Sequence, residues 1–241
     1  MKYMASMKQP TIASSAPAEF AGDRGVATRQ KLLTAAIDVF GQYGFDGTTT
    51  RALAAAAGVN LQAIPYYFGG KDGLYLAAAE HLAALITSHV GSQRQQVHDR
   101  LAEIQRDGRP VTQEEARALL TALLNTLAEV MVSERSRAWA RFLIREQMAP
   151  TEAFSKIYEA VMRPIVETVR RLVGILLDLP PASEQAGLRA LSLIGSVMVF
   201  RVANATVLRQ LDWSEMGPQE LDAIRANVSD IVRALQGGGA K

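Results

Sequence analysis

Residues 49–68 read TTRALAAAAGVNLQAIPYYF. It divides into two short helical segments that meet at Gly58. A glycine suits a tight turn because a left-handed backbone is inexpensive only without a β-carbon. Ala54 lies where the two helices would cross, and its small side chain permits their close approach. The stretch therefore predicts a helix-turn-helix, a motif that reads DNA.

The two sides of this motif differ in chemistry. An apolar set is expected to share a core with a preceding helix over residues 28–43, whose own apolar residues recur at helical spacing. The inward residues of the motif are Leu53, Ala57, Val59 and Ile64. Those left for the outer side are Arg51, Leu61, Gln62, Ala63, Tyr66 and Tyr67. Guanidinium and amide groups pair with base edges, and phenols donate to phosphates.

Charge gives weaker support for a DNA-facing surface. Between Asp46 and Asp72 the charged residues are Arg51 and Lys71, both cationic. A surface without carboxylates suits the approach to phosphates, although an alanine-rich stretch can lack them by chance. The net charge of the 241-residue chain is only +2, so the whole molecule says little about its partners.

Residues 28–76 resemble the TetR family of bacterial transcription regulators. The resemblance rests on the first-helix pattern and on an ordered set of short motifs: YGF at 43–45, TTT at 48–50, AAGV at 56–59, YF at 67–68, KD at 71–72, and Leu74. It implies that one set of residues holds phosphates, namely Thr49, Thr50, Tyr66, Tyr67 and Lys71. It implies that another set faces bases, namely Arg51, Leu61, Gln62 and Ala63.

Two positions depart from the family pattern. Pro65 stands where the family usually has an aromatic residue, and Gly70 stands where a capping serine is common. Inside a helix, a proline removes a donor and clashes with the carbonyl four residues back, here that of Leu61. The reading helix is therefore expected to be kinked or very short.

The rest of the chain is expected to be helical, which makes the protein all-α: a three-helix helix-turn-helix domain followed by a larger helical domain. The predicted helices cover residues 71–106, 112–132, 134–148, 151–178, 184–211 and 218–236, with bends near Gly91 and Pro164. Thr112 and Glu115 have the spacing of a capping box. The expected division is a flexible tail over 1–25, a DNA-binding domain over 26–72, a ligand-binding and dimerisation domain over 73–236, and a flexible end over 237–241.

The larger domain also carries a resemblance. The segments RFLIREQMAPTEAF at 141–154, MRP at 162–164 and FRVANATVLRQLDW at 200–213, with Tyr158, are similar to the CecR-type (YbiH-type) subgroup. That similarity implies a regulator of transport or drug-sensitivity genes. Family similarity also implies a homodimer through helices 184–211 and 218–236, although their apolar residues are equally expected in a monomer core.

A region rich in aromatic residues and methionine suggests a pocket for a small hydrophobic effector. A few polar groups on an apolar wall are typical of such a site. The same polar groups would equally suit a structural ion pair between helices. The candidate ligand residues are Trp139, Phe142, Arg145, Glu146 and Tyr158.

Other classes of function find little support. Cysteine is absent, His81, His89 and His98 lack the spacing of a metal pair, and no catalytic set or phosphate loop is present, so we expect no catalytic residue, metal or cofactor. No secretory signal or membrane span is expected, which predicts a cytoplasmic protein. The expected function is a repressor released from a palindromic operator by its effector, with the helix after Lys71 as the lever. The alternatives are a ligand-independent architectural DNA-binding protein and an enzyme using the larger domain's cavity.

Overall fold

The computed structural model describes residues 18–134 and 136–235, and every regular element in these two ranges is helical. This confirms the all-α prediction. The elements are α1 (Ala18–Tyr43), α2 (Thr50–Ala57), α3 (Ala63–Phe68), α4 (Lys71–Arg106), α5 (Gln113–Val132), α6 (Ser136–Met148), α7 (Glu152–Ile157), the π-helix η1 (Tyr158–Met162), α8 (Arg163–Leu177), α9 (Glu184–Val202), α10 (Asn204–Leu211) and α11 (Pro218–Arg233).

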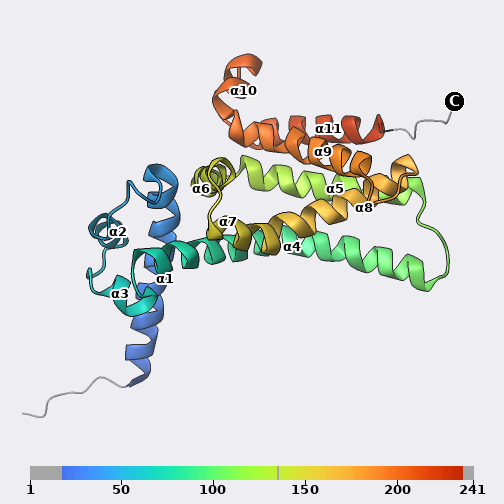
Figure 1. Cartoon of the computed structure of the whole chain (residues 1–241). Helices are drawn as coiled ribbons and strands as arrows, with labels where there is room; N and C mark the ends of the chain where they lie inside the picture. The colour runs from blue at the N-terminus through green and yellow to red at the C-terminus, as the bar shows by residue number, and fades with distance from the viewer. Residues whose placement is uncertain (1–17, 135, 236–241) are drawn as a thin grey trace, which may run out of the picture.

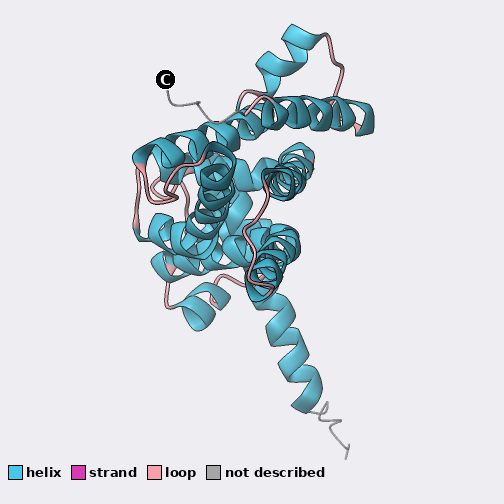
Figure 2. Ribbon diagram, turned by 90° about the vertical axis from the view of Figure 1, so that its right-hand side faces the viewer, coloured by secondary structure: helices cyan, strands magenta, loops and turns pink. Residues whose placement is uncertain are grey.

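The helices form a small N-terminal unit and a larger layered one. In Figure 1, α1 to α3 gather at one end of α4, which runs from them beneath the larger unit. Helices α5 and α8 pack above α4, and α9 and α11 form the outermost layer on α5. Figure 2 shows the first turns of α1 and the whole of α10 projecting from this body.

The helix-turn-helix forms as its sequence predicts. Thr49 caps α2 by accepting a hydrogen bond from the backbone N–H of Ala52 at 3.1 Å. Gly58 ends α2 in the left-handed conformation, with φ of 62°. Leu53, Ala54 and Ile64 are buried, while Ala57 and Val59 pack against the same core as the buried face of α1. The turn and its inner side therefore follow from local sequence.

The reading helix is very short, as one of the two expectations had it, and Pro65 lies near its start. Helix α3 begins at Ala63, so Pro65 lies in its first turn, where a backbone N–H has no intrahelical acceptor. The carbonyl of Leu61 lies outside the helix and accepts from the N–H of Ile64 at 3.3 Å. The expected clash is thus avoided, because the helix starts two residues after Leu61.

The first helix is longer than predicted. It begins at Ala18, so residues 18–25, expected in the flexible tail, are helical; the rest of that tail, 1–17, and the predicted end over 237–241 lie outside the described residues. Thr28, the expected start, lies inside the helix and donates to the carbonyl of Arg24 at 2.8 Å. The Tyr67 hydroxyl reaches α1 at Gly25, where a β-carbon would lie only 3.1 Å from it. This tertiary contact supports the extra turns.

Two predicted long helices are interrupted. The helix expected over 151–178 contains η1, in which the N–H of Arg163 bonds to the carbonyl of Tyr158 five residues back. A π-turn directly before Pro164 accommodates the proline, which cannot supply a regular helical hydrogen bond. The helix expected over 184–211 breaks at Ala203, with φ of −105° and ψ of 32°. Neither glycine nor proline stands at this break, and α10 buries no side chain.

Smaller differences concern helix ends. Helix α6 begins at Ser136 rather than 134, and α11 ends at Arg233 rather than 236. Helix α4 is uninterrupted from Lys71 to Arg106, including Gly91. The predicted capping box of α5 is confirmed, with the Thr112 side chain accepting from the N–H of Glu115 and the Glu115 side chain accepting from the N–H of Thr112.

Helix α9 is unusually apolar for its degree of burial. Among the described helices, Glu184–Val202 has the length and composition of a membrane span, with a mean hydropathy of 1.2 over an 18-residue window of which 28% is buried. One or two such helices are common in proteins that do not span a membrane, because buried core helices have the same composition. In α9 the apolar residues lie on both the inner and the outer face.

Candidate nucleic-acid interface and apolar cavity

The outer side of the helix-turn-helix is exposed where base contact was predicted. Arg51 is exposed on α2, and Leu61 and Gln62 are exposed in the turn before α3. The N–H of Gln62 donates to the Asn60 side chain at 2.9 Å, which fixes the backbone of this turn. Ala63, by contrast, is half-buried and packs against the core. The exposed candidate base-reading side chains therefore come from α2 and from the turn before α3, rather than from the body of α3.

The predicted phosphate-contacting residues have unequal freedom. Tyr66 is 81% exposed, whereas Tyr67 is half-buried and packs edge-on against Tyr66 at 4.7 Å between ring centroids. The Lys71 ammonium lies 4.2 Å from the centre of the Phe45 ring at the start of α4. Thr49 and Thr50 begin α2, with the Thr49 hydroxyl already used as a cap. Tyr66 is thus exposed, whereas Thr50, Tyr67 and Lys71 are half-buried.

A shallow hollow beside α3 adds residues that sequence reasoning missed. Thr28 and Lys31 of α1 line it together with Asn60, Gln62 and Tyr66. Lys31 is exposed and brings a cation to the reading surface. The signal in the sequence was a polar position on the outer face of the first helix, but only the packing of α1 against α3 brings it beside the motif.

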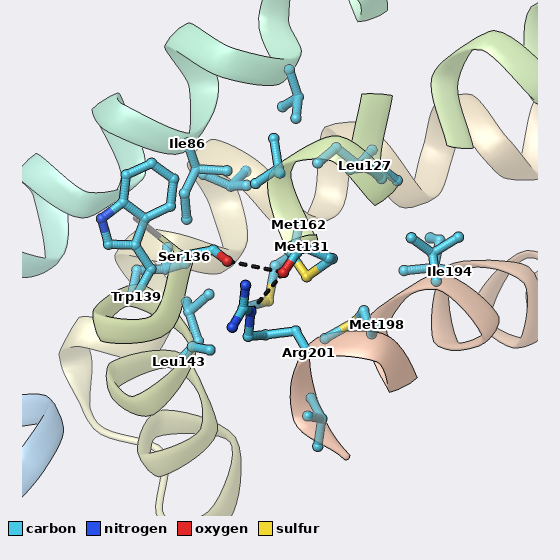
Figure 3. A pocket seen from close by; sticks show the side chains of 18 of the residues that line it. Ile86, Leu127, Met131, Ser136, Trp139, Leu143, Met162, Ile194, Met198 and Arg201 are labelled. Atoms are coloured by element: carbon cyan, nitrogen blue, oxygen red, sulfur yellow. Dashed lines mark hydrogen bonds between the residues drawn. The ribbon is translucent and has the colours of Figure 1, made fainter. Parts of the chain in front are cut away.

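A cavity of about 210 Å³ lies within the larger unit, between α4, α5, α6, η1, α8 and α9. Its wall is almost wholly apolar, and Figure 3 shows Ile86, Leu127, Trp139 and Ile194 around it. The polar lining side chains are Ser136, Gln147 and Arg201. This apolar space is partly open, because the exposed Leu191 and Val202 of α9 also line it. An apolar pocket with few polar groups is suited to a small hydrophobic ligand.

The predicted ligand residues separate into two groups. Trp139 lines this cavity, whereas Phe142, Arg145, Glu146 and Tyr158 do not. Phe142 is buried against Tyr75, with 5.1 Å between ring centroids, and Tyr158 stacks on Phe154 near the surface. Sequence alone could not separate them, because a step of one residue along α6 changes the face: Leu143 lines the cavity and its neighbour Phe142 does not.

Glu146 belongs to a buried polar network. Its side chain is 2% exposed and accepts hydrogen bonds from the Tyr75 hydroxyl and from the backbone N–H of Thr151, the latter at 3.1 Å. Burial, followed by the hydrogen bond to this carboxylate and its negative charge, raises the pKa of Tyr75 well above its usual value. The phenol therefore remains a donor at physiological pH and joins α4 to α6.

Helix α6 lies between the cavity and the N-terminal unit. Trp139 and Leu143 face the cavity, while Arg145 points the other way and donates to the carbonyls of Gly41 and Gln42, each at 2.8 Å. These carbonyls end α1, so the cation also suits the negative end of that helix. At Gly41 a β-carbon would lie 3.2 Å from backbone atoms of α6, which shows how closely the two helices approach.

The described residues contain no group of three or more His, Cys, Asp or Glu arranged to hold a metal ion. His81 instead lies beside Gln30 of α1, with their side-chain nitrogens 2.8 Å apart. His89 packs against Trp139.

Comparison with known sequences identifies both units. Residues 32–78 match the family described as bacterial regulatory proteins, tetR family. Residues 116–239 match the family described as HTH-type transcriptional dual regulator CecR, C-terminal domain. The HTH-type transcriptional dual regulator CecR of Shigella flexneri is 29% identical over 215 residues, which cover 89% of this chain and 94% of that protein.

Solved structures show the same fold. A TetR-family regulator from Mesorhizobium loti superposes with a TM-score of 0.57 at 16% identity, covering 88% of this chain and 96% of that one. AibR in complex with isovaleryl coenzyme A and operator DNA gives 0.56 at 14% identity, covering 85% and 97%. FadR from Bacillus subtilis in complex with stearoyl-CoA gives 0.53 at 15% identity, also covering 85% and 97%.

The two matched families occupy consecutive parts of the chain, in the same order as the helix-turn-helix and the larger helical unit. The Shigella relative spans both. This chain is therefore a DNA-binding transcription regulator rather than an enzyme, and it belongs to the TetR family, with a CecR-type C-terminal domain.

Proposed function

We propose that the protein acts in the cytoplasm as a homodimeric repressor that binds a palindromic operator and leaves it when a small apolar effector fills the cavity. The reading domain takes in residues 26–72, and residues 73–236 form the effector and dimerisation domain. The observation that carries this proposal is the position of α6, which lines the cavity and holds the end of α1. The CecR-type resemblance favours transport or drug-sensitivity genes as targets.

The exposed residues of the helix-turn-helix suit two kinds of DNA contact. Arg51, Leu61 and Gln62 are available to base edges in the major groove, with Ala63 close behind them. Tyr66 is the first candidate for a phosphate contact because it is exposed, and the other candidates are Thr49, Thr50, Tyr67 and Lys71. Residues 24–72 contain five basic residues and three carboxylates, and Asp38 is paired with Arg141 of α6 at 2.6 Å. Exposed cations such as Lys31 favour a phosphate-facing surface.

A dimer is supported by the outer face of α9. Leu188, Leu191, Val199 and Val202 recur at helical spacing and are exposed, with Leu188 at 59% and Val202 at 55%. Gly195 lies in the same stripe with open space around it. A continuous apolar stripe of this kind is typical of a helix that packs against a partner. A two-fold dimer would hold two reading domains about 34–36 Å apart, which matches successive turns of a palindromic site.

Ligand control is supported by the connection between cavity and reading domain. The AibR structure contains both an acyl-coenzyme A and operator DNA, and the FadR structure contains another acyl-coenzyme A. In this chain, Ile86 and Val90 of α4 also line the cavity. A ligand in the cavity would therefore act on the reading domain through α4, the helix predicted to transmit the change, as well as through α6. An effector shifts the balance between DNA-binding and released conformers only if it binds the released one more tightly.

Fluorescence anisotropy tests the DNA-binding surface. The labelled DNA is the region upstream of the protein's own gene, with a scrambled sequence as control, at fixed salt. Arg51→Ala and Tyr66→Ala should each weaken specific binding by about tenfold, which corresponds to about 1.4 kcal/mol. Arg233→Ala, on the exposed end of α11, is the matched control and should leave binding unchanged. Equal binding of both DNAs by the wild type would contradict a sequence-specific regulator.

A further inference from the structure

The cavity has one charged group in its wall, the guanidinium of Arg201. Arg201 is only 8% exposed, and Figure 3 shows its guanidinium beside Ser136 and Leu143 within the ring of lining side chains. An arginine is rarely buried without a partner, because removing a charge from water is costly. Its place in an otherwise apolar wall therefore calls for an explanation.

The hydrogen bonds of Arg201 leave part of the guanidinium unused. Nε donates to the carbonyl of Met131 at 2.6 Å, and Nη2 donates to the carbonyl of Ser133 at 2.7 Å. A guanidinium carries five N–H donors. Within ranges 18–134 and 136–235, Nη1 has no acceptor, and no carboxylate lies within ion-pair distance of this side chain.

The local charges leave the cation uncompensated. Glu134, the acidic residue whose field reaches Arg201, is itself paired with Arg137 at 2.9 Å. Burial and the charge of Arg137 lower the pKa of Arg201, but an arginine remains protonated in proteins. Carbonyl dipoles therefore hold a full positive charge against the cavity, and an anion would be favoured there.

The other two polar side chains of the cavity wall, Ser136 and Gln147, already have partners within the protein. The Ser136 hydroxyl already donates towards the carbonyls of Met131 and Ser133, at 3.1 and 2.8 Å. The Gln147 amide lies 3.5 Å from the Met162 sulfur. A ligand that fits this wall thus needs a largely apolar body and one negative group.

From this arrangement we propose that the effector is a compact apolar monocarboxylate, whose carboxylate pairs with Arg201 and whose body fills the space bounded by Trp139, Leu143 and Ile194. The inference rests on the proposed effector role of the cavity. A volume of about 210 Å³ suits a free acid, whereas a coenzyme A ester carries several phosphate charges that one cation cannot match.

The position of Arg201 connects this ligand to the switch. Its two carbonyl partners close the C-terminal end of α5, directly before α6 begins. A carboxylate paired with the free Nη1 group attracts a guanidinium that is bonded to these carbonyls through Nε and Nη2, and so acts on the α5–α6 junction. Helix α6 in turn is bound to the end of α1.

Calorimetric titration of the full chain tests the ligand class. The probes are straight-chain acids from butanoate to dodecanoate and phenylacetate, each compared with the alcohol, the amine and the coenzyme A ester of the same carbon skeleton. At least one acid should bind about tenfold or more tightly than its alcohol and amine. If no acid binds, or if the alcohol, the amine or the ester binds as tightly as the acid, the proposal is wrong. This comparison uses the wild type and so does not depend on the folding of any variant.

Variants then locate the contact. Arg201→Gln should lose the preference for acid over alcohol, while Arg201→Lys should retain part of it. Arg209→Gln, at an exposed position on α10, should behave as the wild type. Leu143→Trp should block acid and alcohol alike by filling the cavity. A folded Arg201→Gln protein that still prefers the acid would overturn the role of Arg201.

Operator binding, measured in the same samples, separates this proposal from the regulator function. If an apolar alcohol or amine releases the operator while no acid binds, the ligand class is wrong and ligand-controlled repression stands. If the wild type does not bind its operator, repression itself fails, whichever acids bind.

Discussion

At the scale of single residues, His81 joins the reading domain to the long helix α4. Its imidazole accepts a hydrogen bond from the Gln30 amide when the ring is neutral. Burial, and then the positive charge of Arg29, lower its pKa below the ordinary value. The folded protein therefore resists protonation of His81, whereas the unfolded chain does not.

This difference gives a pH dependence with a definite sign. The unfolded His81 takes up a proton near pH 6.5, so stability that is present above that pH is lost as the pH falls below it. We expect denaturant unfolding to show this loss between about pH 7 and about pH 5. His81→Gln should make that part of the profile flatter, and His98→Gln, at an exposed position on the same helix, should not. Identical profiles for all three proteins would exclude a contribution from His81.

At the scale of elements, α6 has two working faces. One face supplies Trp139 and Leu143 to the cavity, and the other supplies Arg141 and Arg145 to α1. Of all helix pairs in the described chain, α1 and α6 are in the most extensive contact. A displacement of α6 by a ligand is therefore transmitted directly to the helix that supports the helix-turn-helix.

Arg145→Gln tests this connection. The substitution removes the cation from the two carbonyls that end α1, so the free energy of unfolding should fall by about 1–2 kcal/mol. Hydrogen exchange should also accelerate at the amides of residues 38–43, because the end of α1 is released. The control Arg233→Gln removes an arginine whose ion pair lies within one exposed helix, and it should change stability by less than about 0.5 kcal/mol. Unchanged exchange in α1 would show that Arg145 does not hold the two domains together.

At the scale of the whole molecule, α9 has apolar residues on two opposite faces. Ala190, Leu193 and Val197 face the core of their own chain, whereas Leu188 and Val199 face outward. This explains why a helix with the hydropathy of a membrane span is buried over only 28% of its most apolar window. The outer stripe matches the proposed two-fold interface.

Val199→Glu tests the interface. A carboxylate at this exposed position should leave the fold of one chain intact, but burying it unpaired between two copies is costly. Ultracentrifugation should find the wild type at twice the 26.1 kDa chain mass and the variant shifted towards a single chain. Met148→Glu introduces the same charge at a position 82% exposed on α6 and should remain dimeric. A monomeric wild type, or a dimeric Val199→Glu protein, would contradict this interface.

Some features followed from the sequence because they depend on neighbouring residues. The turn at Gly58, the start of α4 at Lys71 and the Thr112 capping box are local conformations with local hydrogen bonds. The outer residues of the helix-turn-helix also followed from helical periodicity, since a buried and an exposed face alternate regularly.

Other features depend on contacts between distant segments and could not be predicted from the sequence. Helix α1 extends back to Ala18 beside Tyr67, and the helix expected over 184–211 breaks at Ala203 without any residue that disfavours helix. Neither the assignment of Arg145 and Glu146 to helix packing nor the presence of Arg201 in the cavity wall followed from spacing along the chain. The helices and the reading motif could be predicted from the sequence alone, because periodicity and caps are short-range. Tertiary packing determined the cavity and its charge, because these depend on which helix faces meet.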